Sequence, residues 1–154
     1  MVIEAVNGFE MPNPITIRSA DTADEARLAV LYARVRREDF AWKSGDAITL
    51  SDFDRDTDGE KIFVADVHGE IVGFVSVWLA DRFIHHLYVD KRYRRLGVAT
   101  RLLGMAVTVA GLPVRLKCQT RSLAAMAMYE RFGWKRVGEG GEAGREFVEL
   151  EYGG

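Results

Sequence analysis

The chain has few of the features that disulfide-linked, membrane-spanning or nucleic-acid-binding proteins require. Its 154 residues include one cysteine, Cys118, so no intramolecular disulfide can form, which fits a reducing compartment. No apolar run is long enough to span a bilayer, and the first residues lack the basic and apolar segments of a secretory signal. The formal net charge of −2 gives no global basic field for a nucleic acid or an anionic membrane. We therefore expect a soluble, cytoplasmic protein without nucleic-acid or membrane partners.

The apolar residues are sufficient for one globular domain, because hydrophobic residues make up 48% of the sequence. We expect a single domain over residues 1–154, with residues 1–13 as a lead-in that ends near Pro12 and Pro14. Apolar and β-branched runs predict strands at residues 15–18, 61–67, 71–79, 83–89, 114–119, 134–137 and 145–152. Helical spacing predicts helices from the acidic cap at 21–25 to about Phe40, at 97–110 and at 122–132, with a short helix or loop within 42–59.

The order of these elements predicts a mixed α/β sheet. The strands at 61–67, 71–79 and 83–89 follow one another through short turns, which favours an antiparallel meander. The strand, helix and strand between residues 83 and 119 favour a parallel pair joined by a right-handed crossover. The sequence therefore predicts a mostly antiparallel sheet with one parallel pair and with helices on both faces.

A short basic turn joins the strand at 83–89 to the next helix. The first N–H groups of a helix are unpaired and carry partial positive charge, so anions bind there. Gly97 and Ala99 lack bulk where an anion would approach the backbone, and Arg94 and Arg95 add charges that suit phosphate oxygens. Neither a P-loop nor a Gly-x-Gly-x-x-Gly dinucleotide motif is present. The alternative is a solvated turn whose small residues only let the helix pack on the sheet.

Two short motifs resemble those of the GNAT family of N-acetyltransferases. The basic turn resembles the family's acyl-CoA signature, Gln/Arg-x-x-Gly-x-Gly/Ala, as Arg94-x-x-Gly97-x-Ala99. Residues 122–134 resemble its C-terminal signature, Asn-x-x-Ala-x-x-x-Tyr-x-x-x-Gly-Phe. The matching residues there are Ala125, Tyr129 and Gly133, with Ser122 in place of Asn and Trp134 in place of Phe. The two motifs occur in the family's order, and the resemblance extends from about residue 61 to 152 and more weakly from residue 15.

This resemblance implies the GNAT fold and transfer of an acyl group, usually acetyl, from acetyl-CoA to a primary amine by direct attack. The acceptor would be a small-molecule or peptide amine, and a homodimer is possible. In the family the basic loop holds the pyrophosphate through backbone N–H groups. The pantetheine arm lies along the preceding strand, which must part from the strand at 114–119. The cofactor-binding residues implied are Leu87, Tyr88, Val89, Arg94, Arg95, Leu96, Gly97, Val98, Ala99, Thr100 and, weakly, Ser122, whose other role would be a helix N-cap.

The resemblance also gives catalytic candidates. The family places its tyrosine hydroxyl near the sulfur, so Tyr129 would donate a hydrogen bond or a proton to the leaving thiolate; otherwise it is a packed core residue. A base is needed because a free alkylamine is mostly protonated near neutral pH. Strand alternation places His85 on the face of Leu87 and His86 on the face of Ile84. Either histidine could be the base, or a buried core residue.

Several other residues leave alternatives open. Cys118 in a buried strand is more typical of an apolar filler than of a nucleophile, which favours direct transfer. No metal site is predicted. Glu38, Asp52 and Asp54 could hold a cationic substrate or belong to the solvated surface. The alternative function is a non-catalytic CoA-binding or sensing module, because Ser122 replaces the family's Asn and the base is not evident from the sequence.

Overall fold

The computed structural model describes residues 15–39 and 49–154, and the expected lead-in at 1–13 lies outside them. The helices and strands are β1 (Thr16–Ser19), α1 (Glu25–Asp39), α2 (Asp52–Asp56), β2 (Lys61–Val67), β3 (Glu70–Trp78), β4 (Phe83–Val89), α3 (Val98–Ala110), β5 (Val114–Gln119), α4 (Leu123–Arg131), β6 (Lys135–Gly140) and β7 (Phe147–Tyr152). Single-turn 3-10 helices lie at Thr22–Asp24, Leu79–Asp81 and Lys91–Tyr93. The predicted strands and helices are present with slightly shifted ends, and α2 is a short helix within 42–59.

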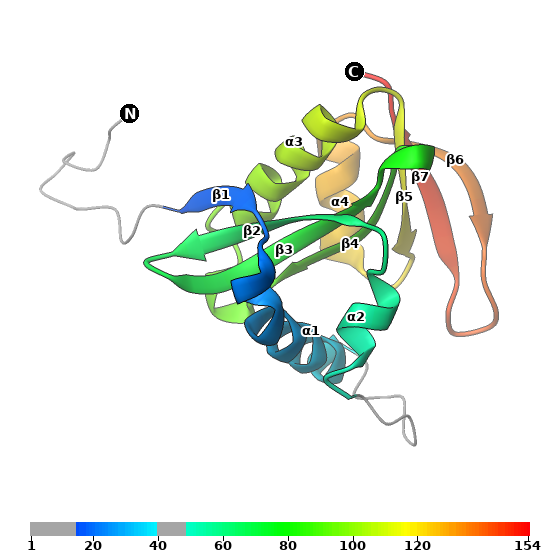
Figure 1. Cartoon of the computed structure of the whole chain (residues 1–154). Helices are drawn as coiled ribbons and strands as arrows, with labels where there is room; N and C mark the ends of the chain where they lie inside the picture. The colour runs from blue at the N-terminus through cyan, green and yellow to red at the C-terminus, as the bar shows by residue number, and fades with distance from the viewer. Residues whose placement is uncertain (1–14, 40–48) are drawn as a thin grey trace, which may run out of the picture.

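The strands form one seven-stranded sheet in the order β1-β2-β3-β4-β5-β7-β6 (Figure 1). Each of β1, β2 and β3 is antiparallel to the strand that follows it in the chain, which confirms the meander. β4 and β5 are parallel and are joined by α3, while β7 lies between β5 and β6 and is antiparallel to both. The mixed sheet with one parallel pair that the sequence predicts is therefore confirmed.

Helices cover both faces of this sheet. On one face, α3 and α4 bury residues such as Leu102 against β3 residues such as Val75. On the other face, Leu31 of α1 and Phe53 of α2 pack against Phe74 of β3. Figure 1 shows α1 and α2 on the opposite side of the strands from α3 and α4. Neighbouring residues of β3 thus enter different cores, and each fully buried leucine or phenylalanine contributes about 1.5–3 kcal/mol.

α3 begins and ends at glycines with positive φ. Gly97, with φ of 83°, is the N-cap, and Gly111, also with φ of 83°, follows the last helical residue and donates its N–H to the Val107 carbonyl. Pro113 follows two residues later and cannot continue a helix. Among the described residues, no helix combines the length and the hydropathy that crossing a membrane would require.

Candidate active site

A gap opens in the middle of the sheet, where β4 and β5 part. The two parallel strands pair only through their first residues, and the last pair is Ile84 with Leu116. Beyond that pair, residues 86–89 stay on β3 and residues 117–119 stay on β7. Each strand therefore keeps its outer neighbour and loses its inner one, so that two backbone edges face each other without sheet pairing. This is the parted pair that the family resemblance implies.

Asp90 anchors the loop that leaves β4. Its buried carboxylate accepts hydrogen bonds from the Arg34 side chain of α1 at 2.7 Å, the Arg92 side chain at 2.9 Å and the Arg92 backbone N–H at 3.0 Å. Mainly the Arg92 side-chain hydrogen bond, helped by the charge of Arg34, holds the pKa of Asp90 below its usual value despite burial. Arg94 Nε donates to the Val89 carbonyl oxygen at 3.1 Å, so part of this guanidinium already binds the strand.

The loop then presents the first N–H groups of α3 to solvent. Arg95 and Gly97 have φ of 67° and 83°, a left-handed conformation that an L side chain adopts at a cost. No side chain of the described residues caps the α3 N-terminus. A β-carbon built on Gly97 would have no heavy-atom neighbour within 4 Å, so the space above the glycine is open. The predicted cofactor residues Arg94 to Gly97 therefore form an exposed turn, and Val98 to Thr100 begin α3, where the first backbone N–H groups can bind an anion.

Tyr129 lies on α4, on the same face of the sheet as α3. Its side chain is buried, and its ring packs edge-on against Trp134 with 5.6 Å between ring centroids. Burial, and secondarily the neighbouring Cys118, raises the pKa of the Tyr129 hydroxyl. Cys118 belongs to the parted segment of β5, so the phenol lies beside the gap. The hydroxyl has no hydrogen-bond partner within residues 15–39 and 49–154, and at neutral pH it is a donor.

Two further predicted residues near the gap have simpler environments. Ser122 is the N-cap residue of α4, yet its hydroxyl makes no capping hydrogen bond and its side chain is exposed. Cys118 is buried, and burial raises the pKa of its thiol to about 11. The thiolate is therefore scarce at neutral pH, as expected for a core filler.

A β-bulge in β4 changes the expected positions of the two histidines. Ser76 of β3 pairs with His86, but the next residue, Val77, pairs with Ile84, so His85 is the extra residue. Ile84 therefore packs in the α3–α4 core, whereas His86 lies on the α1 face with Tyr32. The alternation that the sequence analysis assumes is wrong here, because an extra residue shifts the pleat by one position. Instead of facing opposite sides, the two histidine rings lie together, 3.9 Å apart.

His86 is buried in a closed network on the α1 face. Its Nδ1 lies 2.8 Å from the Ser76 hydroxyl, and its Nε2 lies 3.5 Å from the Tyr32 hydroxyl, which donates to Asp56 at 2.7 Å. Burial, followed by repulsion from His85, lowers the pKa of His86 from 6.5 to about 3. His86 is therefore neutral at physiological pH, and both of its ring nitrogens already have neighbours in the protein.

His85 is much more accessible and has an acidic partner. Its side chain is 45% exposed, and its Nδ1 lies 2.5 Å from Oε2 of Glu60. Glu60 immediately precedes β2, and its side chain is only 6% exposed. Its second oxygen, Oε1, lies 3.7 Å from His86 Nδ1 and has no hydrogen-bond partner among the described residues. A buried carboxylate therefore sits beneath an exposed imidazole at the point where β4 and β5 separate.

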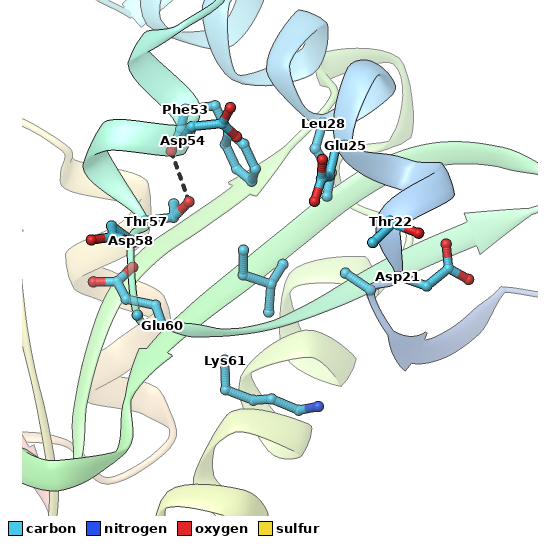
Figure 2. A pocket seen from close by; sticks show the side chains of 13 residues that line it. Asp21, Thr22, Glu25, Leu28, Phe53, Asp54, Thr57, Asp58, Glu60 and Lys61 are labelled. Carbon is cyan, nitrogen blue, oxygen red and sulfur yellow. Dashed lines mark hydrogen bonds between the residues drawn. The ribbon is translucent and has the colours of Figure 1, made fainter.

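An open acidic groove leads from the surface to Glu60. It has a volume of about 500 Å³ and lies between the start of α1 and the α2–β2 segment. Figure 2 shows Asp54, Asp58 and Glu60 along one side and Asp21 and Glu25 along the other. The other described residues that line it are Ala20, Thr22, Leu28, Phe53, Thr57, Gly59, Lys61 and Ile62. This surplus of carboxylates favours positively charged molecules in the groove.

The three acids proposed from the sequence as substrate contacts have different surroundings. Asp52 is buried, accepts from the Thr49 backbone N–H at 3.0 Å, and is therefore part of the fold. Glu38 lies 3.6 Å from Lys91 Nζ in an ion pair. Of the three, Asp54 is the one that lines the groove.

The family model described as "Acetyltransferase (GNAT) family" matches residues 27–134 of this sequence. The chain belongs to the GNAT acetyltransferase family. The GNAT fold uses acetyl-CoA, so the family and the cofactor expected from the two motifs are confirmed. No curated protein sequence matches the chain.

Solved GNAT structures share the fold at low sequence identity. An N-acetyltransferase from Staphylococcus aureus Mu50 superimposes with a TM-score of 0.72 at 15% identity, over 89% of this chain and all (100%) of the other. A ribosomal-protein-alanine N-acetyltransferase from Brucella melitensis gives 0.71 at 20% identity, over 90% and 99%. Arabidopsis thaliana Naa50, solved with the bisubstrate analogue CoA-Ac-MVNAL, gives 0.68 at 14% identity, over 91% and 99%. At these identities the comparisons establish the fold alone.

Within this GNAT fold, the predicted site residues gather around one gap. Leu87, Tyr88 and Val89 form one of its edges, the uncapped end of α3 follows them in the chain, and Tyr129 lies beside the other edge. The sequence analysis missed Glu60. Its only sequence signal is an acid directly before a strand, and no spacing rule connects residue 60 to residue 85.

Proposed function

We propose that this GNAT protein transfers the acetyl group of acetyl-CoA to a primary amine by direct attack. The observation that carries the proposal is the gap between β4 and β5, with uncapped helix donors at one end and the Tyr129 hydroxyl beside it. Such a gap offers an extended acyl carrier a free strand edge, while the start of α3 suits its diphosphate.

The binding roles follow from the geometry of each segment. The pantetheine amides would pair with the open edge of residues 87–89, as an added strand would. The diphosphate would accept hydrogen bonds from the amides of Val98, Ala99 and Thr100, with Arg95 supplying charge nearby. The thioester would then lie in the gap close to Cys118 and Tyr129.

The chemistry requires a nucleophile, a base for the amine proton and a hydrogen-bond donor for the leaving thiolate. The amine nitrogen attacks the thioester carbonyl carbon, the C–S bond breaks, and the thiolate leaves with the electron pair. A base accepts the amine proton, and the thiolate is stabilised by a donor. Tyr129 supplies that donor as a hydrogen bond, because its raised pKa makes it a poor acid. Cys118 takes no part, so no acyl-enzyme forms.

The acidic groove supports a cationic acceptor that enters from the α1–α2 face. Glu60 lines the groove and contacts His85, so an ammonium group held by Asp54 and Asp58 would approach the gap from the side opposite α3 and α4. Small-molecule amines and peptide amines both fit this description.

The test is release of free CoA thiol from acetyl-CoA over a panel of amines, combined with a direct measurement of acetyl-CoA binding. Tyr129→Phe should leave acetyl-CoA affinity within about twofold while lowering kcat, because a hydrogen bond to a charged group contributes about 1.5–3 kcal/mol, or roughly 10- to 150-fold in rate. Tyr152→Phe is the matched control, since Tyr152 also contacts the Trp134 ring but lies on β7.

Two results would contradict the proposal. Acetyl-CoA that does not bind even in large excess would remove the assigned cofactor site. Tight binding without turnover on any amine would instead identify a non-catalytic CoA-binding module.

A further inference from the structure

We propose that His85 is the general base of this acetyltransferase and that Glu60 is its positioning residue, a dyad built by the β4 bulge. The inference rests on the proposed function and goes beyond it by assigning the base that the sequence leaves open. Glu60 precedes β2 and His85 lies on β4, so only the folded sheet brings them together.

The contact between the two side chains fixes the tautomer of His85. A carboxylate can only accept hydrogen bonds, so at 2.5 Å from Oε2 of Glu60 the Nδ1 atom of His85 must carry the proton. Neutral His85 then has its lone pair on Nε2. That atom is the one that can accept a proton from an amine, and the 45% exposure of the side chain leaves it accessible.

The burial of Glu60 makes the dyad sensitive to charge on His85. With a side chain only 6% exposed and Oε1 unpaired, the carboxylate lacks compensation while its partner is neutral. When His85 accepts the amine proton, an imidazolium forms against this carboxylate and the pair is stabilised. An interaction that strengthens as charge develops lowers the barrier rather than only improving binding.

The neighbouring His86 fits a supporting role. Its nitrogens face the hydroxyls of Ser76 and Tyr32, and burial keeps it neutral. Its ring lies 3.9 Å from that of His85 and limits how the exposed imidazole can turn. The bulge is what places both rings on the same side of β4.

The distances favour an acid–base pair over a metal site. Potential ligand atoms of Glu60, His85 and His86 lie within 4.8 Å of one another. Two ligand atoms on a tetrahedral zinc ion would be about 3.3 Å apart, given bonds of about 2.0–2.1 Å. Nδ1 of His85 and Oε2 of Glu60 are instead in direct contact at 2.5 Å, as a hydrogen-bonded pair.

The position of His85 suits proton transfer at the thioester. Ile84 is the last residue of β4 that pairs with β5, so His85 is the first residue at the mouth of the gap. In the transfer step the amine nitrogen forms the new C–N bond, its proton moves to Nε2 of His85, and the C–S bond breaks. The proton on Nε2 then passes to solvent or to the thiolate, which leaves the dyad as it was before the transfer.

The first test uses the tautomer as a signature that needs no activity. The sequence contains three histidines, so a ¹⁵N spectrum of the imidazoles shows three rings that single substitutions can assign. Neutral His85 should carry its proton on Nδ1, and Glu60→Leu should abolish that preference. His68→Asn is the control, because His68 is exposed on the β2–β3 turn and should leave the His85 signals unchanged. A wild-type His85 protonated on Nε2 would overturn the dyad whether or not any variant folds.

The second test separates a positioning role from a structural one. His85→Ala should lower kcat by roughly 10²- to 10⁴-fold, the usual contribution of a general base. Glu60→Leu should lower kcat by part of that factor, and Glu60→Gln should lower it by a smaller part. The KM for acetyl-CoA should be unchanged in each variant. Chelator treatment should have no effect. Full turnover in Glu60→Leu, or loss of turnover on chelation, would refute the dyad while leaving acetyl-CoA binding and the role of Tyr129 intact.

Discussion

Mild acid should destabilise this protein through His86 before its carboxylates begin to protonate. Burial and the nearby His85 lower the pKa of His86 from 6.5 to about 3; Arg36 adds to this effect, and Asp56 opposes it. Glu60 also faces the His86 ring, and its Oε1 atom lies 3.7 Å from Nδ1 of His86. In the unfolded chain no such environment exists, so the imidazole returns to a pKa of about 6.5.

The sign and size of the effect follow from proton linkage. Between about pH 6.5 and 3 the unfolded state binds one more proton than the folded state, so the free energy of unfolding falls as pH falls. The slope is at most about 1.4 kcal/mol per pH unit, and its integral between pH 6.5 and 5 is about 1.6 kcal/mol. That is a large part of a typical total of about 5–15 kcal/mol. Hydrogen bonds from Arg18 lower the pKa of Asp24 to about 2, so Asp24 changes the free energy of unfolding only below about pH 4.

Urea denaturation at several pH values between about 5 and 7.5 measures the slope of the free energy of unfolding against pH. His86→Asn is the informative variant, because an amide can keep the contact to Ser76 but does not titrate. It should be less stable than wild type at neutral pH and should lose less stability on acidification. His68→Asn should keep the wild-type slope. A wild-type slope near zero, or one that His86→Asn does not reduce, would show that His86 is not buried as a neutral group.

Three further predictions concern the cofactor loop, the thiol and the groove. Gly97→Ala should cost about 1–2 kcal/mol through its positive φ and weaken acetyl-CoA binding in calorimetry, whereas Gly104→Ala within α3 should stabilise by about 1 kcal/mol and leave binding unchanged. Cys118→Ala should keep kcat within about twofold in the thiol-release assay, and a complete loss would revive an acyl-enzyme. Replacing Asp54 and Asp58 together by Asn should raise the KM for cationic acceptors and make it less dependent on salt, with the KM for acetyl-CoA as the control.

The sequence predicted most of the fold because its signals were local. Strand and helix patterns, the glycines around α3 and the two motif spacings each lie within a few residues of one another. The gap between β4 and β5 was also predicted, but from the family resemblance. The structure adds the position at which the gap begins, because pairing between β4 and β5 ends at Ile84 and Leu116.

The sequence offered both His85 and His86 as the base and could not choose between them, because the proposed assignment depends on a bulge. The pairing of β4 with Ser76 and Val77 of β3 decides whether His85 has a partner on β3 or is the extra residue of a bulge. No periodicity within β4 reveals that pairing. The partner Glu60 is separated from His85 by 25 residues and is brought near by the β2–β3–β4 meander. Contacts that tertiary structure creates between strands are where single-sequence reasoning ends.

The bulge and the gap are physically related features of β4. In the middle of a sheet, each backbone group that loses its partner gives up about 0.5–1.5 kcal/mol unless something else binds it. Residues 86–89 keep β3 on one side and have no β5 partner on the other, where Arg94 binds the Val89 carbonyl oxygen and water or a ligand can bind the remaining backbone groups. Bulges increase local strand twist, and this one, at His85, directly follows Ile84, the last β4 residue that pairs with β5. The extra residue therefore carries the imidazole that contacts Glu60 at the position where β4–β5 pairing ends, so the proposed cofactor edge and the proposed base meet at one position.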